Sequence, residues 1–179
     1  WTVFPSGSNP VKGVIPVYLW TEAVLRGKEL GPEHGLRGTD KLDNNIKLIW
    51  SVASNILVNQ HGNINRTVEI LKNPDLLEFI IVQDNFMTPS AKYADLVLPA
   101  CTQFETWGVS DGWKYGEEVF LAPKIVDPPF ETKSDYAICA GLAKKFGIYD
   151  QFTEGGRDEK DWTAWFIDEI YRKTRFPEM

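Results

Sequence analysis

EFIIVQDNFMTPSAKYADLVLP, residues 78–99, is the stretch that decides the fold of this chain. It opens with the apolar run 79–82, and an unbroken run of this kind is typical of a strand buried on both faces of a parallel sheet. Thr88 and Pro89 predict the start of a short helix, because Thr is a common helix cap and Pro suits the first helical position. A second strand is predicted over 96–98. The order of strand, capped short helix and strand indicates an α/β protein.

Asp84 stands at the carboxyl end of the first of these strands, which is where ligands bind in open α/β sheets. Its carboxylate offers two acceptor oxygens side by side, and guanine offers two adjacent donors, its ring N–H and its exocyclic amino group. Asp is also a common turn former, so the same side chain could serve only as a turn cap. The residues alone leave both interpretations open.

An earlier strand is predicted over 46–52, and it ends in the small and polar residues Ala53, Ser54 and Asn55. Such residues allow close approach of a phosphate or sugar, and Asn also adopts the left-handed backbone conformation of turns. Asn55 is therefore a candidate for ligand binding, for a turn, or for both. A helix predicted over 65–71 joins this strand to the next, which implies a right-handed parallel crossover.

Other segments carry helix and strand signals. Thr21 predicts the cap of a helix over 22–25, and residues 117–126 have an apolar, strand-like centre. Ser134 predicts the cap of a helix that Gly147 ends. Asp135 follows that cap; it is a candidate for ligand binding, although acidic residues also favour helix N-termini for electrostatic reasons alone. A last amphipathic helix is predicted over 161–172, with an aromatic stripe that indicates either core or a docking face.

These signals predict a three-layer, doubly wound α/β fold with a mostly parallel sheet. Residues 1–45 are expected to be an irregular segment with one helix that packs on the domain. Residues 46–150 are expected to form the α/β domain, and residues 151–179 a Gly-rich linker with the terminal helix.

Composition narrows the possible functions. The 179 residues have a net charge of −6, which disfavours nucleic acid as the main partner. No apolar run approaches the roughly 18 residues that a membrane span needs. Cys101 and Cys139 lie far apart and form no C-x-x-C, so we expect two buried free thiols and no metal site built by this chain alone. The chain begins at Trp1 and is expected to be a segment of a longer protein.

One longer run resembles a known family signature. Residues 80–108, IIVQDNFMTPSAKYADLVLPACTQFETWG, resemble the molybdopterin oxidoreductases related to dimethyl sulfoxide reductase. In that family a strand ends in Asp, a Thr follows four residues later, and Ala-Asp, Leu-Pro and Glu-x-x-Gly come in that order. Residues 46–71 also resemble the preceding strand, turn and helix, and the resemblance covers about residues 19–152. The matching positions here are Asp84, Thr88, Ala94-Asp95, Leu98-Pro99 and Glu105-x-x-Gly108.

The resemblance implies a domain that binds bis(molybdopterin guanine dinucleotide) with molybdenum, in an enzyme that reduces dimethyl sulfoxide or related S- or N-oxides in anaerobic respiration. It implies no catalytic residue and no metal ligand within this segment, and we expect the isolated segment to be inactive. It further implies a 4Fe-4S cluster bound elsewhere in the parent. The cofactor-binding positions that it implies are Asn55, Gln83, Asp84, Thr88, Thr106, Gly108 and Asp135.

The same resemblance implies partners and a location. The partners are the remaining domains of the catalytic subunit, an iron–sulfur electron-transfer subunit and a membrane anchor subunit, at the periplasmic or outer face of the cytoplasmic membrane. Two other hypotheses are a free-standing nucleotide- or flavin-binding α/β protein and a non-catalytic interaction module. The chain contains neither G-x-G-x-x-G nor G-x-x-x-x-G-K-[ST], which counts against the first of these.

Overall fold

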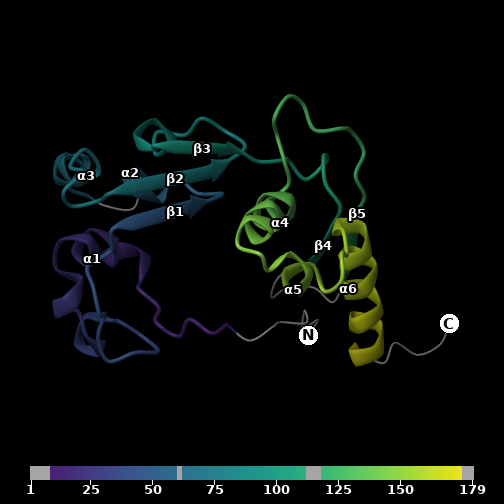
Figure 1. Ribbon diagram of the computed structural model, residues 1–179, viewed down its shortest axis with the longest axis horizontal. Helices are drawn as coiled ribbons and strands as arrows, with labels where there is room; N and C mark the ends of the chain where they lie inside the picture. The colour runs from purple at the N-terminus through teal and green to yellow at the C-terminus, as the bar shows by residue number, and fades with distance from the viewer. Residues whose placement is uncertain (1–8, 60–61, 112–117, 175–179) are drawn as a thin grey trace. The chain divides into compact units, whose positions relative to one another are not determined.

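The computed structural model describes residues 9–59, 62–111 and 118–174 (Figure 1). Contacts divide the chain into two compact units. We call Ser8–Pro99 the sheet unit, and we call the described part of Ala100–Met179 the hairpin unit. The division falls inside the range 46–150 that the sequence predicts as one domain, and that domain assignment stays a prediction.

The sheet unit is built on three parallel strands, β1 (Leu48–Val52), β2 (Phe79–Asp84) and β3 (Leu96–Pro99), in the order β1-β2-β3. The central strand β2 pairs Ile81 with Trp50 on one side and with Leu96 on the other. Ile80 and Val82, on one face of β2, are buried. On the other face Ile81 is half-buried and Phe79 is 39% exposed, so the predicted burial on both faces holds only in part. The predicted α/β class with a parallel sheet is confirmed.

Helices α1 (Trp20–Arg26), α2 (Ile56–Asn59) and α3 (Ile64–Leu71) belong to the same unit. The carboxylate of Glu22 in α1 binds Arg26 at 2.7 Å and Arg66 of α3 at 2.6 Å, and these hydrogen bonds hold the pKa of Glu22 below its usual value. The described residues of the unit also contain four short 3-10 turns: η1 (Val17–Leu19), η2 (Gly27–Glu29), η3 (Pro32–His34) and η4 (Ala91–Tyr93).

The helix caps agree with the sequence only in part. The predicted cap at Thr21 is wrong: α1 begins at Trp20, and Thr21 is buried within its first turn. The cap of α3 is Asn63, whose side chain accepts the N–H of Arg66 at 3.2 Å. The predicted helix start at Thr88 and Pro89 is wrong, because the element there is a 3-10 turn that begins at Ala91 and has Ser90 as its cap residue. The Thr88 hydroxyl still accepts the N–H of Ala91 at 3.2 Å.

The core of the sheet unit packs helix side chains onto β2. Burying each large apolar side chain contributes about 1.5–3 kcal/mol, which makes this cluster the main stabilising feature of the unit. Its buried members are Trp20, Val24, Leu57, Ile70, Leu71, Leu77, Ile80, Val82 and Ala91.

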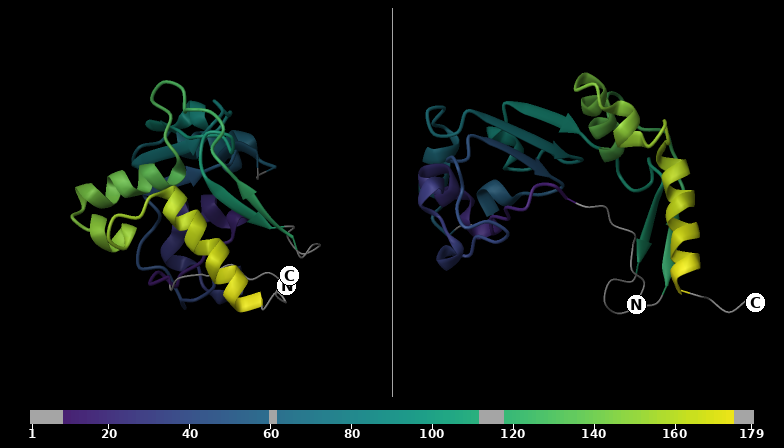
Figure 2. Two further views of the ribbon diagram at one scale, coloured as in Figure 1. Left: turned by 90° about the vertical axis from the view of Figure 1, so that its right-hand side faces the viewer. Right: turned by 60° about the horizontal axis from the view of Figure 1, so that its bottom comes forward.

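The hairpin unit has one antiparallel pair, β4 (Gly108–Asp111) with β5 (Val119–Ala122). Three helices follow: α4 (Asp135–Lys145), α5 (Tyr149–Thr153) and α6 (Glu159–Thr174). Helix α6 lies along the hairpin and contacts β4 (Figure 2). None of the helices within the described residues has the length and apolar character to cross a membrane.

Two of the predicted boundaries in this unit are confirmed. The Ser134 hydroxyl accepts the N–H of Ala137 at 3.0 Å and caps α4, and Gly147, with φ 73°, follows its end. The Gly-rich linker that the sequence predicts from residue 151 onward is wrong at its start, because α5 extends to Thr153. The hydroxyl of Thr153 accepts the N–H of Gly156 at 2.9 Å and stabilises the turn after that helix.

Asp95 fixes the start of the β2–β3 pairing, and its removal tests that role. Its carboxylate accepts the N–H of Ile80 at 2.8 Å, and its own N–H donates to the Ile80 carbonyl at 2.9 Å. We expect Asp95→Ala to lower the free energy of unfolding by about 1–2 kcal/mol, since a hydrogen bond to a charged acceptor is lost. Asp95→Asn keeps one acceptor oxygen and should lose less. Urea-induced unfolding measures both.

The control for this prediction is Asp75→Ala. Asp75 is exposed, and its carboxylate makes no hydrogen bond within the described part of the chain. An Asp95→Ala variant as stable as Asp75→Ala would show that the bond to Ile80 does not hold the strands in register.

Candidate functional site

The carboxyl ends of β1 and β2 lie together and form the first candidate site, which we call the sheet edge. The N–H of Ala53, directly after β1, donates to the carbonyl of Gln83 in β2 at 2.9 Å. Asn55 reaches the loop that follows β2: its Oδ1 accepts the N–H of Ser90 at 3.0 Å and the Ser90 hydroxyl at 2.7 Å. One amide oxygen therefore ties the two strand-end loops to each other.

Asp84 occupies the centre of this sheet edge and is 9% exposed. Its Oδ1 accepts the N–H of Phe86 at 3.0 Å, so the turn-cap role proposed from the sequence is present. No described residue donates a hydrogen bond to its Oδ2. Because each carboxylate oxygen can accept more than one hydrogen bond, the turn leaves acceptor capacity for a ligand.

The backbone is strained beside Asn55. The left-handed residue after β1 is Ala53, with φ 48°, whereas the sequence suggested Asn55 for that conformation. An alanine held at positive φ costs about 1–2 kcal/mol, and such strain is concentrated at ligand-binding and active sites.

The two other residues predicted to bind cofactor near this edge are Gln83 and Thr88. Gln83 is 1% exposed within β2, and the hydroxyl of Thr88 accepts a hydrogen bond from the N–H of Ala91.

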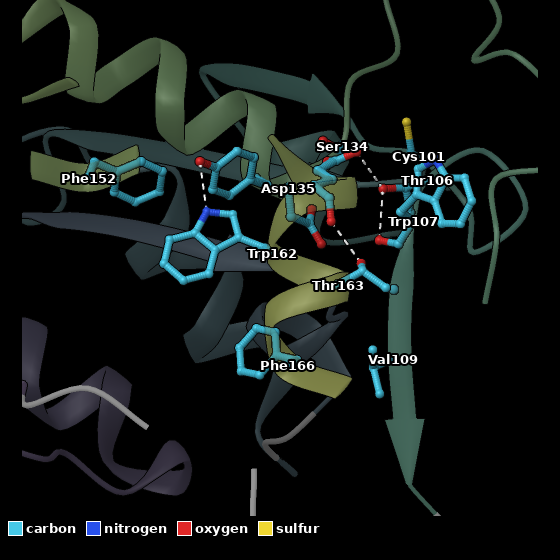
Figure 3. Close-up of a pocket in the computed structure, with 13 residues that line it drawn as sticks. Cys101, Thr106, Trp107, Val109, Ser134, Asp135, Phe152, Trp162, Thr163 and Phe166 are labelled. Atoms are coloured by element: carbon cyan, nitrogen blue, oxygen red, sulfur yellow. Dashed lines mark hydrogen bonds between the residues drawn. The ribbon is translucent and has the colours of Figure 1, made fainter. Parts of the chain in front are cut away.

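The hairpin unit contains a second candidate site, a cavity of about 650 Å³ (Figure 3). Three of the predicted cofactor-binding residues line it: Thr106, Gly108 and Asp135. Phe152 and Trp162 lie on one side of the cavity, and Thr106 lies on the other. The seven predicted residues thus fall into two groups: four at the sheet edge and three in the cavity.

Glu159, the first residue of α6, is the cavity residue that the sequence analysis missed. Its Oε2 accepts the hydroxyl of Thr106 at 2.9 Å, and its Oε1 is buried with no hydrogen-bond partner among the described residues. Burial raises the pKa of Glu159; the bond from Thr106 opposes this rise, and the negative charges of Asp158 and Asp135 add to it. A sequence signal was present: Asp158 and Asp161 cap each other's N–H groups, which places Glu159 in the first turn.

Aromatic side chains form much of the cavity wall. The indole N–H of Trp162 donates to the Tyr136 hydroxyl at 3.0 Å, and that hydroxyl donates to the carbonyl of Arg157 at 2.6 Å. The ring of Tyr136 stacks on Phe152 with centroids 5.4 Å apart. Trp162 also packs against Phe166, and both half-buried rings belong to the cavity wall.

The two cysteines are free, as predicted, but half-buried rather than buried. Burial raises the pKa of both Cys101 and Cys139, so neither thiol is activated as a nucleophile. Among the residues that the structure describes, no group of three or more His, Cys, Asp or Glu side chains is placed to hold a metal ion.

Comparison with known proteins identifies curated relatives. The chain is 42% identical over 180 residues to "Dimethyl sulfoxide reductase DmsA" of Haemophilus influenzae, and 43% identical over 180 residues to the protein of the same name from Escherichia coli K12. Each match covers 98% of this chain and 22% of the relative. The chain therefore spans about a fifth of the length of these relatives.

A solved structure and a family model agree with these matches. Acetylene hydratase from Pelobacter acetylenicus has a similar fold, with a TM-score of 0.63 and 23% identity over 88% of this chain and 20% of that protein. The family model for molybdopterin oxidoreductases matches residues 19–145, which include the sheet unit from α1 onward and the hairpin unit through α4. The chain belongs to the molybdopterin oxidoreductase family.

Proposed function

We propose that this chain is the cofactor-binding part of a larger molybdenum reductase, and that it holds bis(molybdopterin guanine dinucleotide). The observation that carries the proposal is Asp84, a carboxylate at the carboxyl edge of a parallel sheet with acceptor capacity beyond its own turn. Paired acceptor oxygens suit the paired N–H donors of guanine, so the residues at the sheet edge fit the group.

The chain's own residues would bind and orient this cofactor. Asn55 and Thr88 brace the loops on either side of Asp84, the first through Ser90 and the second through Ala91. Gln83 holds the strand end beneath them. In the hairpin unit, Thr106, Gly108 and Asp135 are the proposed cofactor contacts. When bound, the cofactor supplies a molybdenum centre for oxygen-atom transfer.

The proposed parent reaction is the two-electron, two-proton removal of oxygen from a sulfoxide or a related S- or N-oxide, with release of water. The relatives from Haemophilus influenzae and Escherichia coli are named dimethyl sulfoxide reductases, and this name supports the substrate class. We extend the proposal to a 4Fe-4S cluster elsewhere in the parent, to an electron-transfer subunit and a membrane anchor subunit, and to the periplasmic or outer face of the cytoplasmic membrane.

The Asp84→Asn substitution in the full-length enzyme tests the site. Asn retains an oxygen that can accept from Phe86, so the turn and the fold should persist. Its amide places a donor where guanine also presents a donor, which costs on the order of 1.5–3 kcal/mol of binding. We expect the purified variant to retain less pterin and molybdenum, as measured by metal analysis and by release of the oxidised pterin.

The matched control is Thr88→Ala. It removes the cap on Ala91, costs about 1 kcal/mol of local stability and should reduce cofactor retention less. Full retention and unchanged activity in Asp84→Asn would mean that Asp84 serves only its turn, and the site assignment would be wrong.

The isolated 179-residue chain is expected to show no sulfoxide reductase activity. We assign it a role in holding the cofactor, and it spans about a fifth of the relatives that carry the reductase name. The assay follows oxidation of a reduced dye in the presence of dimethyl sulfoxide. Turnover by the purified chain without added cofactor would contradict the assigned role.

A further inference from the structure

The side chains of the parallel sheet divide between two faces, and one of these faces is covered. Successive residues of a strand point to opposite faces, and paired residues of neighbouring parallel strands share a face. Ile80 is paired with Ile49, and Val82 is paired with Val97. All four belong to the core of the sheet unit or pack against it, so the helices of the unit cover this face.

The opposite face, which we call the open face, is almost entirely apolar. Its members follow from the same register, and a single polar residue, Gln83, lies among them at the sheet edge. Within the described residues, the apolar members belong neither to the core cluster nor to the side chains packed against it. The open face consists of Leu48, Trp50 and Val52 of β1, Phe79, Ile81 and Gln83 of β2, and Leu96 and Leu98 of β3.

Solvent reaches the side chains of the open face. Leu48 is 53% exposed, Val52 45% and Leu96 41%, whereas Ile80 and Val82 on the covered face are 2% and 0% exposed. Single exposed apolar residues are common on protein surfaces, but a contiguous apolar surface marks an interface. Strands that are apolar on both faces belong to sheets with both faces covered, so the open face is suited to packing rather than to contact with water.

The dimensions of the open face select a helix as its cover. Helices cover the faces of parallel sheets, because the connections between parallel strands run over those faces. Three strands about 4.8 Å apart span roughly 10 Å, which is the diameter of one helix with its side chains. The residues of β1, Leu48–Val52, extend over roughly 17 Å, so a helix of about eleven residues is long enough to cover them.

The rest of a longer polypeptide is the source that fits this helix. The chain covers 22% of the length of its relatives from Haemophilus influenzae and Escherichia coli, so a parent of that length has most of its residues outside this chain. A second copy of the chain would instead place sheet against sheet, which is the packing of antiparallel sandwiches. A helix of the same polypeptide is also held near the open face at high effective concentration.

We propose that an amphipathic helix of the parent polypeptide, from outside these 179 residues, packs its apolar stripe along the strands of the open face. The stripe has apolar side chains spaced three and four residues apart, and it carries no charged residue, because a charge buried against this surface would have no partner. The proposal rests on the proposed function only in that the chain is part of a longer enzyme, and it does not depend on the cofactor assignment.

Photochemical cross-linking in the full-length parent identifies the occupant. The photoreactive amino acid p-benzoylphenylalanine replaces Phe79, Leu48 or Leu96 in three separate variants, and each is irradiated and digested for mass spectrometry. We expect all three to capture one segment of the same polypeptide outside these 179 residues, at positions three or four residues apart. Capture of a second copy, of another subunit or of this chain alone would overturn the proposal, and so would the absence of any cross-link.

The matched control is p-benzoylphenylalanine in place of Ile64. Ile64 lies in the first turn of α3, outside the sheet, and its exposed fraction of 40% is close to the 39% of Phe79. It should not capture the segment that the open face captures. Capture of the same segment from both places would mean that the cross-links do not report a cover on the open face, and the assignment of that segment would be rejected.

Thiol labelling of Leu48→Cys gives an independent readout. Leu48 is 53% exposed in the sheet unit, so the smaller side chain should leave the fold intact. In the native full-length parent the new thiol should react with a maleimide at least about tenfold more slowly than in the same variant unfolded in urea, because it reacts only when the helix moves away. Equal rates would show that the open face stays in water and would overturn the proposal. Neither measurement uses pterin or molybdenum content, so such a result would leave the cofactor assignment to the Asp84→Asn experiment.

Discussion

The pairing of β2 with strands on both sides is the constraint on which the sheet unit depends. The backbone N–H and C=O groups of a buried strand must be hydrogen-bonded, because leaving one unpaired costs more free energy than a typical bond contributes. β1 and β3 supply those partners in parallel register, from Leu48 with Phe79 to Asp84 with Pro99. Since parallel strands all end at the same edge, this register alone brings the loops after β1 and β2 together.

Hydrogen bonds from polar side chains then fix the conformation of these two loops at the sheet edge. The side-chain oxygen of Asn55 accepts hydrogen bonds from both the N–H and the hydroxyl of Ser90, which is fully buried. One carboxylate oxygen of Asp84 accepts the N–H of Phe86. Neither bond crosses the sheet itself, so both can be kept while the loop surface receives a ligand. The strained backbone at Ala53 belongs to the same edge, and the N–H of Ala53 is held there by the carbonyl of Gln83 at 2.9 Å.

How well the sequence predicted each part depends on how local the cause was. The strand at 79–84, the cap at Ser134 and the end of α4 before Gly147 follow from short-range rules of burial and backbone geometry, and they were predicted correctly. The cap predicted at Thr21 was wrong, because Thr21 instead lies within the first turn of α1, where its side chain is buried and only 4% exposed. The candidate site residues were predicted because they match positions of the family motif. Glu159 lies some fifty residues after that motif, and only the folded chain brings it next to Thr106, so the sequence did not predict it.

Asp84 and Glu159 show two ways in which a folded chain manages a buried carboxylate. At Asp84 the backbone two residues later supplies a donor, and this local bond holds the turn. At Glu159 the donor comes from Thr106, which is far away in sequence, and the second oxygen has no donor within the described residues. Burial raises the pKa of Glu159 because it disfavours the ionised form, and the hydrogen bond from Thr106 opposes that rise. The hydrogen bond from Thr106 therefore favours the ionised form that burial disfavours, and it joins the segment before β4 to the first turn of α6.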